Sequence, residues 1–345
     1  MTTRPVYGEY DAVVSGGGLA GLACALKLAQ QGKRVGLVER RSVLGWEVVR
    51  ARRVIADLTR LGAAEPRLAL LLDVMKERPL WEGNTIYAPY AELLFDRWAA
   101  EAGVDLLLHG WSVGLMEQDG LVEGLIAGTR EGYQELRAEV VIETGDAARL
   151  VQGQPELLEV ALSGVRRAVL VTGGETQDGP GEVLLPSGRR AELRLLIEGR
   201  GLLDIDLQEK TVANRDLEYH GAVIEALTYL RSSVPGCENL KSMFMAEEEW
   251  KQPNVLLSTP TGGSTVGYLL TEGSEGLKSV AINTQALTAQ GMRGLYMGGA
   301  WLSLFQEAST TEELQVWNRW LIGEAAAGAI QQASIVQASQ SEVVN

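Results

Sequence analysis

Residues Val13 to Glu39 read VVSGGGLAGLACALKLAQQGKRVGLVE. An apolar run leads into a cluster of glycines. Small and apolar residues at helical spacing come next, and a second apolar run then ends on an acid. This order predicts a strand, a tight turn, a helix that ends near Gly32, and a second strand. We expect the rest of the chain to be built around this unit.

Three glycines in this stretch, Gly16, Gly18 and Gly21, form the pattern G-x-G-x-x-G. Gly16 allows a tight turn out of the first strand, and Gly18 has no side chain to keep a diphosphate away from the backbone. Gly21 lets the helix lie close to the sheet. The same glycines alone would mean little, but the complete context favours a dinucleotide site over a glycine turn of another α/β protein.

The start of the helix, at Leu19 and Ala20, and the acid Glu39 complete this prediction. Free N–H groups and a partial positive charge at a helix N-terminus favour a diphosphate. A carboxylate at the end of the second strand can accept both hydroxyls of an adenosine ribose, and it would repel a 2′-phosphate. The predicted ligand is therefore a dinucleotide without that extra phosphate.

The bulk composition excludes several classes of protein. The chain has 345 residues, of which 46% are apolar, and a formal charge of −14. That length predicts one large or two ordinary domains, and the acidity argues against nucleic acid as a partner. Cys24 and Cys237 belong to no C-x-x-C, so we expect neither a disulfide scaffold nor a metal site. Since no apolar leader and no run of about 18 apolar residues is visible, we expect a cytoplasmic protein that binds no membrane.

Arginines are prominent after the second strand, at Arg50, Arg52, Arg53 and Arg60. They suit a solvated helix face with ion pairs, and they equally suit contact with an anionic cofactor or substrate. The pattern leaves both readings open.

A helix is expected to start near Trp46, and a further helical segment is expected between residues 67 and 82.

The next part of the chain alternates between helix and strands. Residues 90–102 predict an amphipathic helix that Gly103 stops. Residues 104–110, 112–120 and 121–128 predict a small antiparallel meander, with Asp119-Gly120 as a hairpin turn. Residues 138–146 predict a buried strand that runs into Thr144-Gly145-Asp146.

The run from Ala99 to Asp146 resembles the middle of the flavoproteins with two dinucleotide-binding domains. It is closest to the FAD-dependent oxidoreductase group in which a strand ends in T-G-D. The resemblance implies FAD as the cofactor and places Ser112 and Val113 near its adenine. It also places Thr144, Gly145 and Asp146 beside the cofactor, although the loop is one residue shorter here than in the group.

A second stretch, residues 294–330, resembles the C-terminal block of the same group. It implies a last sheet strand at 295–297, close contact of Gly299 and Ala300 with the cofactor, and a helix from about residue 315 to 330. Two departures stand out, because Ala300 replaces a polar residue and Gln306-Glu307 replaces His-Glu. Earlier in the chain, Gly45-Trp46 stands where the group has a pair of glycines, and Trp46 is either packed in the core or stacked near the flavin.

The resemblance implies an α/β fold, with a Rossmann-like FAD-binding domain that includes a three-stranded antiparallel meander, and a mixed α+β substrate domain. The FAD-binding domain is expected to combine residues 1–62, 88–150 and 290–332, with the substrate domain at 151–289 and a flexible tail at 333–345. The residues expected to contact FAD are Gly16, Gly18, Leu19, Ala20, Gly21, Glu39, Arg40, Gly45, Trp46, Ser112, Val113, Thr144, Gly145, Asp146, Gly299 and Ala300.

The implied function is an FAD-dependent oxidoreductase that transfers a hydride from a small organic substrate to the flavin. A dehydrogenase or oxidase is favoured, and a flavin-dependent monooxygenase is the alternative within this class. The alternative from another class is a flavin-binding scaffold or partner-dependent subunit with little turnover. The sequence names no catalytic residue, since His109 and His220 are better explained as structural, and it leaves open a homo-oligomer or a partner subunit.

Overall fold

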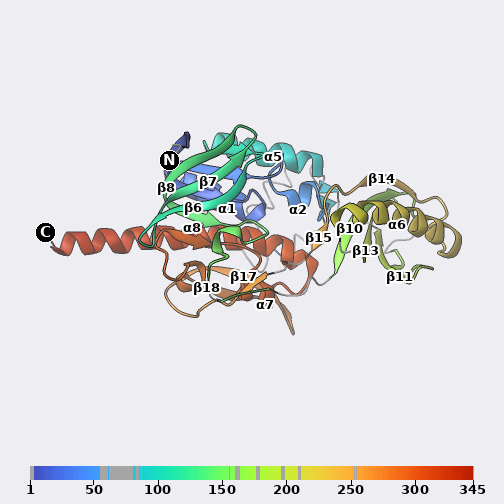
Figure 1. Ribbon diagram of the computed structural model, residues 1–345. Helices are drawn as coiled ribbons and strands as arrows, with labels where there is room; N and C mark the ends of the chain where they lie inside the picture. The colour runs from blue at the N-terminus through green and yellow to red at the C-terminus, as the bar shows by residue number, and fades with distance from the viewer. Residues whose placement is uncertain are drawn as a thin grey trace.

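A computed structural model describes residues 4–344 apart from 55–60, 62–80, 83–84, 87, 155, 160–163, 176–178, 196–198, 209–210, 252 and 254. The N-terminal sheet and its helices form one half of the molecule, and a second sheet with one long helix forms the other (Figure 1). Arg60 and almost all of the helical segment expected at 67–82 lie outside the described residues. Among the helices of the described chain, none has a stretch long and apolar enough to cross a membrane.

The larger sheet runs in the order β5-β2-β1-β8-β7-β6, with β19 also paired to β8. Its strands are β1 (Val6–Ser15), β2 (Val35–Glu39), β5 (Asp105–Leu108), β6 (Trp111–Gln118), β7 (Leu121–Thr129), β8 (Gly132–Glu143) and β19 (Leu295–Met297). β1 lies parallel to β2 and to β8, and β5 and β19 extend this parallel part. The carboxyl ends of these strands therefore meet at one edge, which is where ligands bind in open α/β sheets.

The antiparallel meander is present, but its membership differs from the prediction. Residues 105–108 form β5, which pairs in parallel with β2 instead of opening the meander. The meander consists of β6, β7 and the first half of β8. β8 is longer than the strand expected at 138–146, because its start pairs with β7 and its end pairs with β19.

Helix α1 (Leu19–Gln30) is held close to its neighbours by small residues. A Cβ added to Gly21 would lie 1.7 Å from the carbonyl oxygen of Gly16, and one added to Gly323 would lie 2.0 Å from the carbonyl oxygen of Ala20. Gly323 belongs to α8 (Glu312–Val344), so α1 and α8 approach each other backbone to backbone. The other helices of this half are α2 (Trp46–Val49), α5 (Ala88–Glu101) and α7 (Ser303–Ala308).

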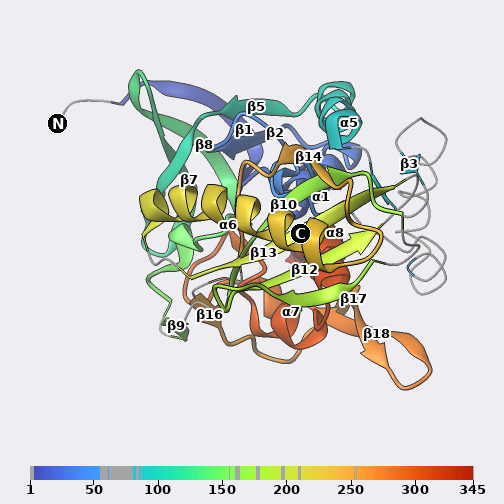
Figure 2. The same cartoon turned by 90° about the vertical axis from the view of Figure 1, so that its right-hand side faces the viewer.

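The second sheet is antiparallel, and α6 (Val212–Ser233) covers one of its faces (Figure 2). Its strands are β10 (Val165–Thr172), β11 (Gly181–Leu184), β12 (Arg190–Leu195), β13 (Arg200–Leu207), β14 (Lys241–Met245) and β15 (Trp250–Lys251). Val169 and Leu203 of the sheet pack with Ala226 and Leu230 of α6 in a core separate from that of the first sheet. Apolar runs at 166–174, 191–199, 202–210 and 254–260 predict four strands in the middle of the chain, and the first three are β10, β12 and β13.

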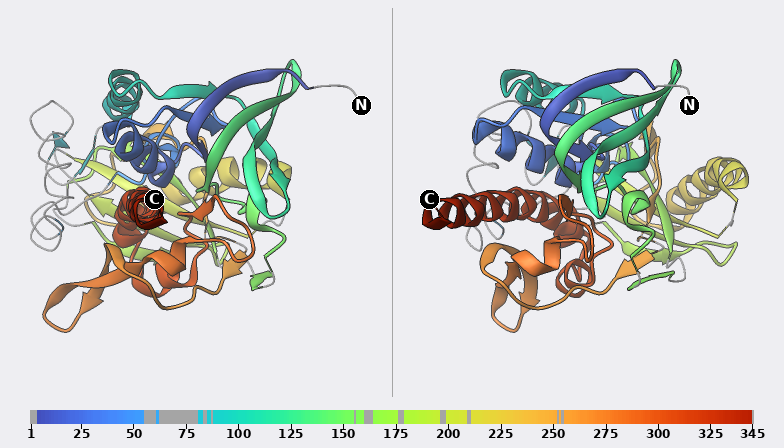
Figure 3. Two further views of the ribbon diagram at one scale, coloured as in Figure 1. Left: turned by 90° about the vertical axis from the view of Figure 1, so that its left-hand side faces the viewer. Right: turned by 60° about the vertical axis from the view of Figure 1, so that its left-hand side comes forward.

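Smaller elements complete the described chain. They are the strand pairs β3 (Trp81–Glu82) with β4 (Thr85–Ile86), β9 (Leu157–Glu159) with β16 (Val255–Leu257) and β17 (Thr265–Gly273) with β18 (Gly276–Asn283), and the 3₁₀ turns Arg149–Val151 and Thr284–Leu287. The fourth strand expected in the middle of the chain is β16, which lies outside the second sheet. Where we expected a flexible tail from residue 333, α8 continues to Val344 and projects beyond the body of the molecule (Figure 3).

Candidate functional site

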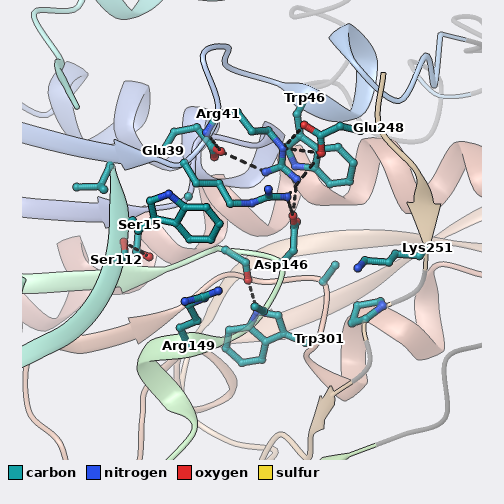
Figure 4. Close-up of a pocket in the computed structure, with 18 of the residues that line it drawn as sticks. Ser15, Glu39, Arg41, Trp46, Ser112, Asp146, Arg149, Glu248, Lys251 and Trp301 are labelled. Atoms are coloured by element: carbon teal, nitrogen blue, oxygen red, sulfur yellow. Dashed lines mark hydrogen bonds and ion pairs between the residues drawn. The ribbon is translucent and has the colours of Figure 1, made fainter. Parts of the chain in front are cut away.

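A cavity of about 680 Å³ opens at the carboxyl ends of the parallel strands. It is lined by Ser15, Gly16, Val38, Glu39, Arg40, Arg41, Trp46, Gly110, Trp111, Ser112, Glu143, Gly145, Asp146, Ala147, Arg149, Arg167, Asp216, Glu247, Glu248, Glu249, Lys251, Pro253, Ala300, Trp301 and Arg319. Figure 4 shows part of this lining, with Glu39, Arg41 and Asp146 from the first half of the molecule and Glu248 and Lys251 from the second. The volume lies within the usual range of cofactor and small-molecule sites.

The glycine turn at one end of the cavity has the geometry that its sequence predicts. Gly16 has a φ of +99°, and a Cβ there would lie 2.8 Å from the amide nitrogen of Gly145. Gly18 is the residue that precedes α1. Thr144 fixes the turn from the neighbouring strand end, because its hydroxyl donates to the carbonyl oxygens of Ser15 and Gly16 at 2.8 and 3.1 Å.

Glu39 ends β2 at the same edge, and it is 2% exposed. Its Oε2 accepts the N–H of Gly17 at 2.5 Å, and its Oε1 accepts the N–H of Arg41 at 2.8 Å. Oε1 also accepts from Nη1 of Arg41 at 3.2 Å, whereas Oε2 keeps a lone pair that can accept a ribose hydroxyl. These two backbone bonds hold the carboxylate where the dinucleotide pattern needs it.

A second buried carboxyl, Glu143, lies at the end of β8. It accepts the N–H groups of Gly145 at 2.6 Å and Leu150 at 2.9 Å, and Ser15 Oγ lies 3.3 Å away. Ser15 also donates to Ser112 Oγ at 2.8 Å, which joins β1 to β6. Burial raises the pKa of Glu143 to about 7, although its hydrogen bonds oppose that rise.

Arg41 joins the two halves of the molecule across the cavity. Its Nε donates to the two oxygens of Glu248 at 2.7 and 2.8 Å, and its Nη2 donates to Asp146 at 2.8 Å. The guanidinium lies over the indole of Trp46, with Cζ 4.2 Å from the ring centroid. Burial would raise the pKa of Asp146, but Arg41 and Arg319 outweigh it and hold that pKa below its usual range.

The N-terminus of α1 is covered by a side chain of α2. Glu47 Oε2 accepts the N–H of Leu19 at 3.0 Å, and Glu47 is only 1% exposed. Arg319 of α8 lies 3.7 Å from Glu47 Oε1. Burial raises the pKa of Glu47 to about 7, with Arg319 acting in the opposite direction.

The other end of the cavity is charged and partly walled by the second half of the molecule. Arg167, Asp216, Glu249 and Lys251 contribute from β10, α6 and the region of β15. Trp301 is fully buried there, and its indole N–H donates to the carbonyl oxygen of Gly145 at 3.0 Å. This end therefore offers polar groups of both signs beside an aromatic wall.

The structure brings half of the sequence-predicted contact residues to the cavity wall. Those residues are Gly16, Glu39, Arg40, Trp46, Ser112, Gly145, Asp146 and Ala300. Those outside the lining set are Gly18, Leu19, Ala20, Gly21, Gly45, Val113, Thr144 and Gly299. Val113 is 44% exposed, and the residues of β6 that line the cavity are Trp111 and Ser112.

Sequence reasoning missed several lining residues. Arg41, Arg319 and Trp301 had no motif to mark them, and Lys251 lies in the part of the chain that resembled nothing. Trp46, for which two readings were open, is 4% exposed and also lines the cavity, so it packs in the core and borders the site. Arg53 likewise proved to be buried and ion-paired, instead of solvated on a helix face.

The residues at the dinucleotide end fit FAD. The glycine turn leaves the backbone bare at Gly16, Glu39 ends the second strand, and the cavity continues from there to the second half of the chain. Residues 11–153 match the family described as FAD dependent oxidoreductase. This match covers the segment that carries the glycine turn, Glu39 and Asp146, and it supports an FAD-dependent oxidoreductase.

Several solved structures share the fold of this chain. A geranylgeranyl bacteriochlorophyll reductase-like protein from Thermoplasma acidophilum has a TM-score of 0.55 at 14% identity, over 97% of this chain and 83% of that one. The myxobacterial chondrochloren halogenase has a TM-score of 0.55 at 14% identity, over 90% and 73%. Glycine oxidase from Bacillus cereus has a TM-score of 0.53 at 15% identity, over 94% and 95%. No curated protein sequence matches the chain.

Proposed function

We propose that this flavoprotein is a dehydrogenase or oxidase of a small, polar organic substrate. One observation carries the proposal. A single cavity joins Glu39, where the adenosine is expected, to Arg167 and Lys251 of the second half of the molecule. Such a cavity has one end for the dinucleotide and another for a second compound.

The expected contacts of FAD follow from the lining residues. Glu39 is placed to bind the adenosine ribose, and Ser112 lies beside it on β6. Asp146 and Ala300 line the part of the cavity between this end and Trp301. When bound, the flavin supplies a hydride acceptor. The chain itself supplies binding, orientation and a polar surrounding for the substrate.

The character of the substrate follows from the charges at the other end. Arg167 and Lys251 face a cavity that also contains Asp216 and Glu249. Arg167 is held by the backbone oxygens of Ala246 and Glu247 at 2.9 and 2.8 Å. Groups of both signs at one end favour a substrate that carries charge or several hydrogen-bonding groups over a large apolar one.

The test is anaerobic reduction of the FAD-loaded protein by panels of amino acids, hydroxy acids and amines. Bleaching of the flavin absorbance by one of these classes, without NAD(P)H, is the expected result. Rapid reduction by NADPH in the absence of any substrate would instead favour the monooxygenase alternative. The electron acceptor is then identified by reoxidation with O₂ or with an artificial dye.

A second candidate is a flavin-binding subunit with little turnover of its own, which works with a partner protein or a second copy of the chain. The observation that favours it is the cover that Trp46 and Glu47 place over the start of α1. Photoreduction separates the two candidates. Bound flavin that resists both photoreduction and every substrate class would support the second candidate, and flavin that bleaches readily would support the enzyme.

A further inference from the structure

The carboxylate of Glu47 occupies the place where a diphosphate is expected. Its Oε2 accepts the first free N–H of α1, that of Leu19, at 3.0 Å. Its Oε1 lies 2.6 Å from the position that a Cβ on Gly18 would take. Gly18 is the residue whose missing side chain lets a diphosphate approach the backbone. The protein's own anion therefore lies on the diphosphate seat, meaning the backbone of Gly18 and Leu19.

The charged groups around Glu47 come from three other elements. Arg319 of α8 lies 3.7 Å from its Oε1, and the same guanidinium lies 4.0 Å from Asp146 after β8. Arg41, after β2, binds Asp146 and stacks on the neighbouring Trp46. Two carboxyl groups thus share Arg319, and a diphosphate would bring further negative charge to the same place.

The backbone that carries Glu47 is fixed next to the seat. It belongs to the short helix α2, whose residues Trp46, Val48 and Val49 are all buried. Gly45 enters that helix with a φ of +57°, and a Cβ there would lie 2.4 Å from the ring of Phe95. The backbone of α2 therefore holds Glu47 beside the seat, and a diphosphate that binds there displaces the carboxyl from the N–H of Leu19 by side-chain rotation alone.

We propose that the protonation state of Glu47 controls how tightly the diphosphate of FAD binds at the diphosphate seat. The ionised carboxylate repels the diphosphate, and the protonated carboxyl donates a hydrogen bond to it. Binding then takes up one proton from solvent. The inference rests on FAD being the ligand and adds to that assignment the ionisation state in which the ligand binds.

The pH range follows from the environment of Glu47. Burial raises the pKa of this carboxyl to about 7. Below that pH the group is protonated and affinity for the diphosphate is at its maximum. Above it, only the protonated fraction of the protein binds, so affinity falls by about tenfold for each pH unit. Between pH 7, where half of the carboxyl is protonated, and pH 9 the expected loss is roughly 50-fold.

The test uses the full chain freed of flavin and ADP-ribose as the probe. ADP-ribose carries the diphosphate between two sugars, so its phosphates do not titrate near neutral pH. Isothermal titration calorimetry at pH 6, 7, 8 and 9, in two buffers of different ionisation heat, measures both affinity and proton uptake. Wild type should show the loss of affinity above pH 7 and an uptake that approaches one proton. Adenosine, which lacks phosphate, should show neither.

Two variants separate Glu47 from the other buried carboxyl. Glu47→Gln should bind ADP-ribose with an affinity that does not change with pH, and at pH 9 it should bind more tightly than wild type. Glu143→Gln should keep the wild-type pH dependence, because Glu143 lies on Gly145 and Leu150 instead of on α1. Thermal unfolding of both variants establishes that they are folded.

The outcomes distinguish this inference from the FAD assignment. Binding of ADP-ribose by wild type with the same affinity from pH 6 to pH 9 would overturn the role of Glu47 and leave the FAD site standing. A pH dependence that survives in Glu47→Gln would do the same. Failure of every variant to bind ADP-ribose or FAD at any pH would overturn both.

Discussion

Arg53 Nη1 lies 2.7 Å from Oδ1 of Asp204, and neither side chain reaches solvent. Arg53 follows α2 in the first half of the molecule, whereas Asp204 lies on β13 of the second sheet. Arg53 also binds Glu312 of α8 at 3.0 Å, and Arg194 of β12 binds the same two carboxylates at 3.0 and 3.3 Å. Two arginines and two acids thus form a cluster that joins the two halves beneath the cavity.

Replacing Asp204 by Asn should therefore destabilise the protein strongly. Arg53 would then keep only Glu312, and Arg194 would keep Glu312 and its 3.6 Å contact with Glu192. Removing one partner from a buried ionic cluster costs about 3–5 kcal/mol. Urea unfolding at neutral pH measures the loss. Arg190→Gln is the matched control, because Arg190 is 60% exposed where it pairs with Asp206 at 3.2 Å, and exposed pairs contribute about 0–1 kcal/mol. Equal losses of unfolding free energy in the two variants would mean that burial does not increase the contribution of the cluster to stability.

Gly21→Ala should break the close approach between turn and helix. The added methyl group would lie 1.7 Å from the carbonyl oxygen of Gly16, so the backbone has to move. We expect a loss of roughly 3 kcal/mol of stability, at the upper end of the cost of overpacking, together with loss of bound FAD. Gly221→Ala, in α6 with open space around its Cβ, is the control and should keep wild-type melting and flavin content. Full retention of FAD by the Gly21→Ala variant would show that the turn does not hold the cofactor.

The fold of the first half could be predicted because its signals are local. The turn at Gly16, the acid at Glu39 and the alternating strands after Gly103 lie within short windows of sequence. The strand with which residues 105–108 pair could not be predicted, because a short apolar strand carries no sequence signal for which neighbouring strand it joins. The extent of α8 was also missed, since its polar end resembles a tail.

The site was predicted at its dinucleotide end and missed at its other end, for a physical reason. Gly16 and Glu39 act through backbone geometry that a motif records. Arg319 and Lys251 reach the cavity only because distant segments pack together. Glu47 has no sequence signal for its position on α1, since a glutamate in a four-residue helix is ordinary.

Glu39→Gln should weaken FAD binding without abolishing the fold. The amide keeps one oxygen acceptor, but it turns its other acceptor into a donor beside the N–H groups of Gly17 and Arg41. Loss of a buried charged acceptor costs about 1–3 kcal/mol, which corresponds to roughly a 5- to 150-fold weaker Kd. Quenching of flavin fluorescence measures the Kd. Glu9 is an exposed carboxyl on β1, the strand that leads into the glycine turn, so Glu9→Gln should bind FAD with the wild-type Kd. A similar increase of Kd in both variants would mean that the loss of any negative charge weakens binding.

Glu143 should make the protein less stable as pH rises through the acid range. Burial raises its pKa from 4.5 to about 7, so between these values the folded state holds a proton that the unfolded state has released. Stability therefore falls with rising pH across this window, by up to about 1.4 kcal/mol per pH unit from this group, and levels off above pH 7.

Urea unfolding at pH 5, 6, 7 and 8 tests this directly. Glu143→Gln removes the titrating group and keeps one oxygen, which can accept the N–H of Gly145 or that of Leu150 but not both. The variant should therefore be less stable overall, while its stability should fall less between pH 5 and pH 7. A slope should remain, because Glu47 titrates in the same window and in the same direction. Asp146 contributes oppositely and at lower pH, since its pKa lies below the usual range and its stabilisation is lost on acidification. Parallel curves for wild type and Glu143→Gln would mean that the Glu143 carboxyl is already ionised in the folded protein at pH 5.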